Sequence, residues 1–354
     1  LSRRQRQMCI RDRDMATYYM TNRSCPYSKS ILERAFEGGY NFLDALIGQE
    51  CCCTMNRMEQ YFDYCELIPK DKFFVACIDM PINRSEWHVG YYRRQMEKKI
   101  LEPLRETYGV DFSEERLRAA IAEHNELCRI ITEMGDMRKA ENPVITGYEF
   151  HVIQLVSQVC PHELILPYIK ETLEEIKTRE PEPKPWFRAR VMVTGAEIDD
   201  PEFTKMLEMC GAMVVADRYC FGSMPGREQI EIRDGETALD AIARHYLYNN
   251  HCPRAMGPEN LRARKLYVYN KAMEYGAEGV IIESMKFCEY WGYERAQDSA
   301  WLTEGFALPG TLPVCQIERD YTCAASGQLR TRFQAFVESL EIKRIQAAEQ
   351  KEGA

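Results

Sequence analysis

The sequence predicts an α/β protein with two parallel-sheet regions and a helical insertion between them. Near both ends of the chain, short apolar runs alternate with amphipathic helical patterns, which is typical of parallel sheets. Residues 86–180 carry helical patterns alone. A proline-rich stretch, 181–187, follows, and we expect it to be an extended linker before the alternation returns.

The first region, residues 14–85, is expected to be an N-terminal α/β domain that lacks its first strand. Its first helix has apolar residues at helical spacing and ends at Gly38-Gly39. Two apolar runs of strand length follow, each ending in a turn. The expected helices are 28–37 and 55–64, and the expected strands are 42–47 and 72–78.

The insertion is expected to contain four helices. Ser113, followed by Glu114 and Glu115, suits a helix start, because a hydroxyl can cap the first turn and acidic residues favour the positive end of the helix dipole. The expected ranges are 86–108, 113–134, 144–159 and 163–178.

The second region, residues 188–345, is expected to be a C-terminal α/β domain, followed by a polar tail at 346–354. Gly195 and Gly211 mark turns after a strand and after a helix. The expected strands are 190–193, 212–216, 279–283 and 312–318, and the expected helices are 200–210, 239–248, 258–275 and 328–345.

Residues 1–13 do not match the rest of the chain. They read LSRRQRQMCIRDR, and the second half of this stretch looks like a translated sequencing-library adapter. A basic targeting segment is the alternative, but Asp12 and Asp14 interrupt it. We therefore expect these residues to be non-native and exclude them, with Cys9, from the interpretation.

Composition narrows the class of function. A net charge of −9 disfavours a non-specific nucleic-acid binder, and no apolar run has the length of a membrane span. Fifteen cysteines is a high and odd number for 354 residues, and no secretory segment is evident. A reducing, cytoplasmic setting with metal or cluster ligation is therefore expected, rather than a disulfide scaffold.

Three cysteine neighbourhoods lie where expected strands or helices end. Cys25 opens the first helix, Cys51-Cys52-Cys53 follows the first strand, and Cys288 follows the strand at 279–283. Ligand sites of parallel sheets lie beyond the carboxyl ends of the strands, so three thiols could meet there. The spacing alone leaves a plainer alternative open, namely buried thiols at strand ends. The chain has no Cys-x-x-Cys, no His-Glu-x-x-His, no Gly-x-Gly-x-x-Gly and no P-loop.

Several segments, in order, resemble the 2-hydroxyacyl-CoA dehydratase and benzoyl-CoA reductase family. Ser24-Cys25-Pro26 and Cys52-Cys53-Thr54-Met55-Asn56-Arg57 are similar to its first two cluster segments. The second half agrees in Val193-Thr194-Gly195-Ala196-Glu197-Ile198-Asp199-Asp200-Pro201, His251-Cys252-Pro253-Arg254, Lys286-Phe287-Cys288, Glu318-Arg319-Asp320-Tyr321 and Gly327-Gln328-Leu329-Arg330-Thr331-Arg332-Phe333. The resemblance covers roughly residues 20 to 342.

The resemblance implies two Rossmann-like (flavodoxin-like) domains with a helical insertion and a [4Fe–4S] cluster between them. Carried over, its ligands are Cys25, Cys52 and Cys288. The family usually has Cys-Asp in the second segment, whereas Cys53 stands here in the Asp place, so Cys51 or Cys53 remains a substitute for Cys52. Three protein ligands leave one iron open to a substrate atom.

The implied reaction is the removal of water from a 2-hydroxyacyl-CoA. One electron added to the thioester carbonyl gives a ketyl radical anion, which expels the hydroxyl and acidifies the β-proton. The implied partners are a sister subunit and an ATP-hydrolysing iron–sulfur activator. Arg330 and Arg332, near the start of the last helix, are candidates for contacts with CoA phosphates, or for a solvated helix face.

Two other functions stay open on the sequence alone. One is a subunit of a benzoyl-CoA-type reductase, and the other is a sister subunit that supports the assembly or relays electrons without contacting substrate. Cys220 and Cys252 are expected to be structural.

Overall fold

The computed structural model describes residues 14–50, 52–224, 227–249, 251–255, 257–321 and 326–352. Its strands are all parallel to their neighbours and form two sheets within this part of the chain. The α/β class with parallel sheets in two regions is therefore confirmed. The expectations for residues 1–13, for Cys51 and for the end of the chain at 353–354 lie outside the described residues.

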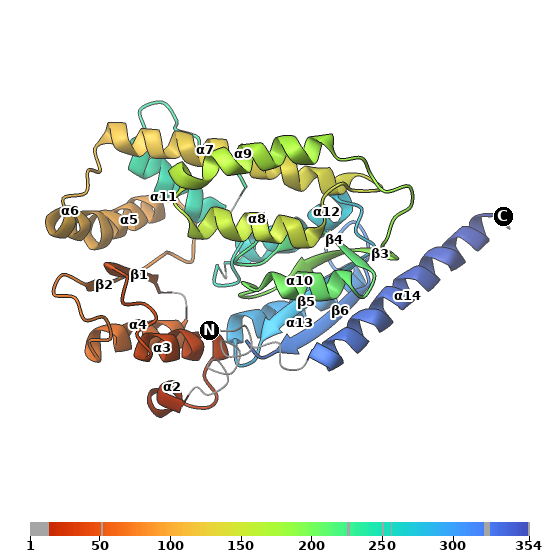
Figure 1. Cartoon of the computed structure of the whole chain (residues 1–354), viewed down its shortest axis with the longest axis horizontal. Coiled ribbons are helices and arrows are strands. Elements are labelled where there is room, and N and C mark those ends of the chain that lie inside the picture. Colours follow the sequence, from red (N-terminus) through yellow and green to blue (C-terminus); the bar gives the residue numbers. More distant parts are fainter. Residues whose placement is uncertain are drawn as a thin grey trace.

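The N-terminal part is a small two-stranded sheet covered by helices (Figure 1). Strand β1 pairs with β2 in register from Ala45↔Phe74 to Gln49↔Ile78. Leu32, Met58 and Phe62 are buried between the helices and the sheet, which is why the apolar spacing in the sequence marked these helices. The elements are α2 (Asp14–Tyr19), α3 (Pro26–Phe36), β1 (Ala45–Gln49), α4 (Cys53–Tyr64) and β2 (Phe74–Ile78).

The helical insertion forms a separate layer above both sheets (Figure 1). Its apolar stripes pack around Ile130, Met134 and Phe150. The expected helix 86–108 is one continuous rod, but five of its residues form a π-helical turn. The elements are α5 (Glu86–Met96), the π-helix η1 (Glu97–Leu101), α6 (Glu102–Tyr108), α7 (Glu114–Asp136), the 3₁₀-helix η2 (Met137–Lys139), α8 (Gly147–Val159) and α9 (His162–Thr178).

A reciprocal cap fixes the start of α8. The Thr146 hydroxyl accepts the backbone N–H of Glu149 at 3.1 Å, and the Glu149 carboxylate accepts the backbone N–H of Thr146 at 2.9 Å. Replacing Thr146 by Ala removes one half of this box, so we expect the free energy of unfolding to fall by about 1 kcal/mol. Denaturant unfolding would measure the change. Thr146→Ser, which keeps the hydroxyl, should recover most of it, and an equal loss in both variants would contradict the capping role.

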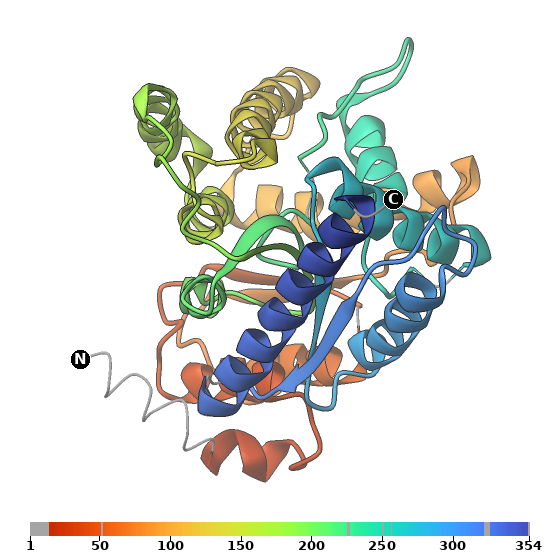
Figure 2. The ribbon, with the colours of Figure 1, turned by 90° about the vertical axis from the view of Figure 1, so that its right-hand side faces the viewer.

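The C-terminal part is a four-stranded parallel sheet with the order β4-β3-β5-β6 and helices on both faces. Phe203, Phe333 and Phe336 fill the face under α10 and α14, and Val268, Ala272 and Leu302 fill the face under α12 and α13. Figure 2 shows α14 running across the first of these faces. The elements are β3 (Ala189–Thr194), α10 (Pro201–Glu208), β4 (Ala212–Arg218), α11 (Ala238–Tyr248), α12 (Pro258–Glu274), β5 (Gly279–Met285), α13 (Glu289–Glu304), β6 (Val314–Arg319) and α14 (Ser326–Glu352).

Three features differ from the expected elements. Helices α2 and α13 were not expected, and α14 continues past residue 345 to Glu352. The inner side of α13 buries Glu294 and Asp298 beside Trp291 and Leu302, so an apolar period could not mark it. Helix α11 packs on α5 and α7, where Ala243 meets Val89, and thus joins the helical layer although it follows β4 in the chain.

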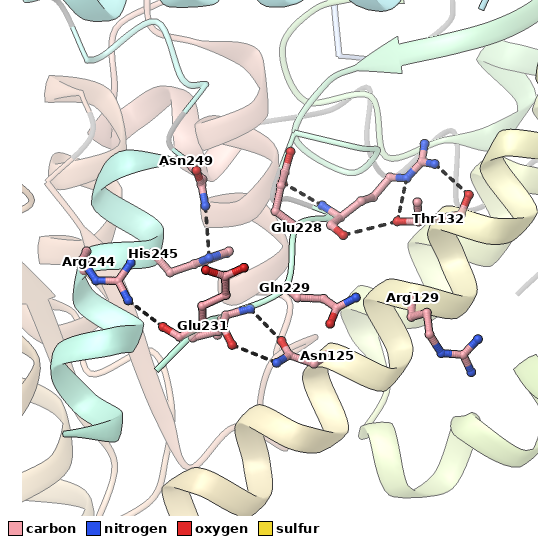
Figure 3. A pocket seen from close by; sticks show the side chains of 11 residues that line it. Asn125, Arg129, Thr132, Glu228, Gln229, Glu231, Arg244, His245 and Asn249 are labelled. Atoms are coloured by element: carbon pink, nitrogen blue, oxygen red, sulfur yellow. Dashed lines mark hydrogen bonds between the residues drawn. The ribbon is translucent and has the colours of Figure 1, made fainter. Parts of the chain in front are cut away.

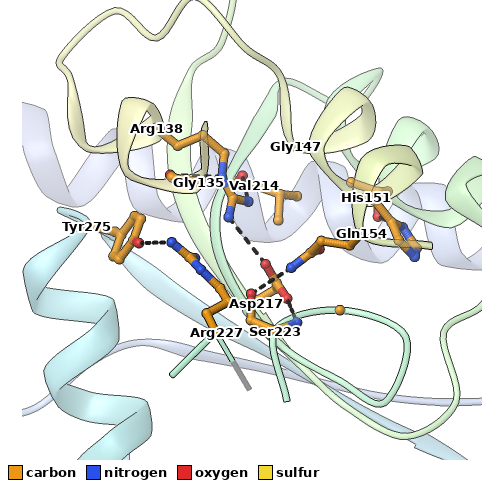
Figure 4. A network of polar contacts seen from close by, with 12 residues as sticks. Gly135, Arg138, Gly147, His151, Gln154, Val214, Asp217, Ser223, Arg227 and Tyr275 are labelled. Atoms are coloured by element: carbon orange, nitrogen blue, oxygen red, sulfur yellow. Dashed lines mark hydrogen bonds and ion pairs between the residues drawn. The ribbon is translucent and has the colours of Figure 1, made fainter. Parts of the chain in front are cut away.

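Polar contacts join the helical layer to the C-terminal sheet (Figure 4). The buried Arg138 guanidinium donates to the Val214 carbonyl at 3.1 Å and pairs with Asp217 at 3.3 Å. Asp217 also accepts the backbone N–H of Ser223 at 2.6 Å, and Gln154 of α8 donates to the Ser223 hydroxyl at 2.7 Å. The end of β4 and the loop that follows it are therefore held against α8.

Candidate functional site

The predicted cysteines stand at helix starts beyond strand ends. Cys25 immediately precedes α3, Cys52 is the N-cap of α4 just after β1, and Cys288 is the N-cap of α13 just after β5. Cys52 is extended, and its Sγ accepts the backbone N–H of Met55 at 3.5 Å, as an N-cap side chain does. The turn before Cys288 places Phe287 in the left-handed region with φ of 60°, a conformation that costs about 1–3 kcal/mol for a residue with a side chain.

These three cysteines line one cavity of about 300 Å³ between the N-terminal and C-terminal domains. Two contacts hold the walls together. Tyr27, at the start of α3, packs edge-to-face on Tyr321, which follows β6, with ring centres 5.3 Å apart. The Tyr321 hydroxyl donates to Asp199 at 2.6 Å. The cysteines on the wall are Cys25, Cys52, Cys53, Cys220, Cys252 and Cys288.

Burial disfavours the thiolate form of these cysteines. It raises the pKa of Cys25 to about 11, against the lowering effect of the Ser28 backbone N–H. Burial and then the Glu197 carboxylate also raise the pKa of Cys288 and of Cys220. Thiols in such a site ionise only beside a strong positive charge, and a bound metal centre supplies one. The donor set therefore fits an iron–sulfur group better than a reactive free thiolate.

Glu197 is a buried carboxylate on the same wall. Its Oε2 atom is buried and has no hydrogen-bond partner among the described residues. Burial, and then the nearby Glu283 and Cys52, raise the pKa of Glu197 to about 7, although its own backbone N–H and Arg319 act in the opposite direction. An unpaired buried oxygen of this kind suits a proton, an iron or a bound ligand.

The described side chains do not form a site for a single metal ion, since no three His, Cys, Asp or Glu side chains among them converge closely enough. A cubane is wider than one ion, so thiols that hold it stand farther apart. Disulfides are also absent from the part of the chain that the structure describes, where every cysteine is free.

Not every predicted residue reaches the cavity. Cys53 lines it although the residue is largely exposed, and Cys51 lies outside the described residues. Arg330 and Arg332 are exposed on the early turns of α14 and are not among the lining residues, so a contact with CoA phosphates stays a prediction.

Sequence reasoning missed three residues of the wall, namely Glu197, Cys220 and Cys252. The signal that could have found two of them is position, since Glu197 follows β3 and Cys220 follows β4 within three residues. Cys252 is on a loop before α12, where no strand end marks it.

A larger cavity of about 710 Å³ lies elsewhere, between α7, α11 and residues 227–231 (Figure 3). Its arginines pair within the protein. Arg129 contacts Glu133 at 3.4 Å, and Arg244 contacts Glu236 at 2.7 Å. This cavity contains none of the predicted cysteines, so size alone does not mark the chemical site.

Comparison with known proteins gives a consistent result. A family profile described as "2-hydroxyglutaryl-CoA dehydratase, D-component" matches residues 8–340. The chain is similar to the (R)-phenyllactyl-CoA dehydratase beta subunit of Clostridium sporogenes, with 25% identity over 316 residues, 89% of this chain and 80% of that protein. It is also similar to lactoyl-CoA dehydratase subunit beta of Anaerotignum propionicum, with 25% identity over 328 residues, 92% and 82%. One subunit of the benzoyl-CoA reductase of Thauera aromatica is 20% identical over 268 residues, 75% and 67%.

Proposed function

Since the chain belongs to the 2-hydroxyglutaryl-CoA dehydratase D-component family, we propose that it is the [4Fe–4S]-carrying subunit of a hetero-oligomeric, cytoplasmic 2-hydroxyacyl-CoA dehydratase. The observation that carries this proposal is the cavity between the domains, where cysteines from three distant segments share one wall with a buried, unpaired carboxylate. Cys25, Cys52 and Cys288 would hold the cluster, which supplies one electron to the thioester carbonyl when it is bound.

The chain's own residues would prepare the site. Trp291, almost fully buried, and Met55 cover the cavity and restrict water around the thiols. Glu197 can hold a proton on Oε2 near neutral pH, next to the place where a hydroxyl group must leave. Protonation of that hydroxyl makes it a better leaving group.

The partners are part of the same proposal. Relatives named as beta subunits support a sister subunit beside this chain. A separate ATP-hydrolysing iron–sulfur activator would deliver the electron, because no nucleotide-binding motif was found in the sequence. A 2-hydroxyacyl-CoA is the proposed substrate.

A subunit of a benzoyl-CoA-type reductase is the second candidate, since the chain is also similar to one subunit of a benzoyl-CoA reductase. The third candidate is a sister subunit that does not contact substrate. All three would hold a cluster, so the cavity alone does not separate them, and product analysis is needed.

The test is an anaerobic assay of the chain purified with its sister subunit, activator and ATP. We expect a 2-enoyl-CoA to form from a 2-hydroxyacyl-CoA and no dearomatised product to form from benzoyl-CoA. A dearomatised product would favour the reductase. Unchanged turnover after Cys52→Ser in this chain alone would instead assign it to the supporting role.

A further inference from the structure

A second cavity adjoins the cysteine cavity. It has a volume of about 530 Å³ and lies between the N-terminal sheet, α4, α5 and the end of α11. The two spaces share four lining residues, Met55, Cys220, Cys252 and Arg254. A molecule that reacts at the cysteine wall can therefore extend a side group past these residues. We call this second space the methionine chamber.

The chamber is lined chiefly by apolar side chains. Four of them are methionines, which are flexible and polarisable and which contact aromatic rings favourably. Two tyrosines, Tyr92 and Tyr246, complete one side. An apolar cavity of about 150 Å³ is enough for a benzene ring, so the chamber has room for an aromatic side chain. The methionines are Met55, Met58, Met80 and Met224.

The charged groups of the chamber disfavour an anionic guest. Glu59 is buried, its Oε2 has no hydrogen-bond partner among the described residues, and burial raises its pKa. Arg254 is the one cation among the described lining residues, and its guanidinium donates to the Met80 carbonyl and to Asp79. A second carboxylate would meet Glu59 and find this guanidinium already engaged.

We propose that the methionine chamber receives the side chain of the 2-hydroxyacyl group and selects apolar, aromatic acyl groups over dicarboxylic ones. This inference rests on the proposed dehydratase function. The thioester and hydroxyl would lie at the cysteine wall, and the side chain would bury its apolar surface among the methionines. That burial favours a phenyl-bearing acyl group over a methyl-bearing one, because each buried methylene adds about 0.8 kcal/mol.

The first test compares 2-hydroxy-3-phenylpropionyl-CoA, 2-hydroxypropionyl-CoA and 2-hydroxyglutaryl-CoA on the anaerobic enzyme with its partners. We expect kcat/KM for the phenyl-bearing thioester to exceed that for the dicarboxylic one by at least about 100-fold. A preference for the dicarboxylic thioester would overturn the proposal.

The second test fills the chamber. Leu46→Trp, on β1, should lower kcat/KM for the phenyl-bearing thioester by about tenfold or more and leave the methyl-bearing one nearly unchanged. Ile31→Phe, on α3, provides an independent narrowing variant. Leu43→Trp adds the same bulk at a half-buried position outside the lining and should change neither value. An equal loss for all thioesters in both narrowing variants would contradict the proposal.

Binding separates this inference from the function it rests on. Dissociation constants for the unreactive 3-phenylpropionyl-CoA and glutaryl-CoA, measured by calorimetry on the same complex, need no turnover. Tighter binding of the phenyl analogue that Leu46→Trp weakens supports the chamber even if no 2-enoyl-CoA forms, in which case only the dehydratase proposal fails. Turnover without any such binding difference overturns the chamber alone.

Discussion

Replacing Cys52 by Ser should remove most of the iron from the anaerobically purified chain, and replacing Cys25 or Cys288 should do the same. A [4Fe–4S] cluster on three cysteines loses a third of its protein donors in each variant, and a serine hydroxyl is a much poorer ligand for iron than a thiolate. We expect iron to fall from about four per chain to below about one, with loss of the visible absorption of the cluster. Metal analysis and absorbance on the same sample measure both.

Matched substitutions locate the ligands. Cys315→Ser, on β6 and outside the cavity, should keep full iron content, and Cys220→Ser and Cys252→Ser should keep it as well. Loss of iron in Cys53→Ser but not in Cys52→Ser would move the second ligand by one position, and Cys51→Ser tests the other neighbour. Full iron in all three predicted-ligand variants would sink the cluster proposal.

Replacing Glu294 by Gln should destabilise the C-terminal domain by about 3–5 kcal/mol, because it leaves buried cations without an anion. Glu294 contacts Arg218 at 2.7 Å, Arg264 at 3.1 Å and Lys265 at 3.0 Å. All four side chains are buried, and Asp298 would be the one carboxylate left in contact with this group, through Arg218 and Lys265. The midpoint of denaturant unfolding measures the loss.

The consequence reaches the candidate site, since Arg218 also donates to the His251 carbonyl at 3.0 Å, next to Cys252. We therefore expect Glu294→Gln to weaken iron retention on warming as well. Glu174→Gln, in an exposed pair with Lys177, is the control and should change stability by less than about 0.5 kcal/mol. Similar midpoints for the two variants would show that the buried charges are not needed for the fold.

Acid should act through the same group. Burial alone would raise the pKa of Glu294, but Arg218, Lys265 and Arg264 together hold it below its ordinary value of 4.5. A carboxyl with a lowered pKa in the folded state stabilises the protein above its unfolded value, and this stabilisation is lost as the pH falls. Wild type should lose stability below about pH 4.5 more steeply than Glu294→Gln does.

Local patterns in the sequence were enough for most elements. Each expected strand has a counterpart, because an apolar run such as Val280 to Ile282 is buried on both faces of a parallel sheet. Helix α13 escaped because its buried side pairs charges instead of packing methyl groups, and a hydrophobic period cannot report that. The site was only partly foreseen, since Cys25, Cys52 and Cys288 had marked positions whereas Glu197 and Cys252 did not.

The sequence by itself determined the alternation of strands and helices and the placing of cysteines at their ends, because both depend on neighbours along the chain. Only the tertiary structure decided which of those ends face one another. Cys25 and Cys288 share a cavity because the small N-terminal sheet sits against the C-terminal one, and contacts such as Tyr27 on Tyr321 fix that approach. Packing between domains joins residues hundreds of positions apart, and no local period encodes such a distance.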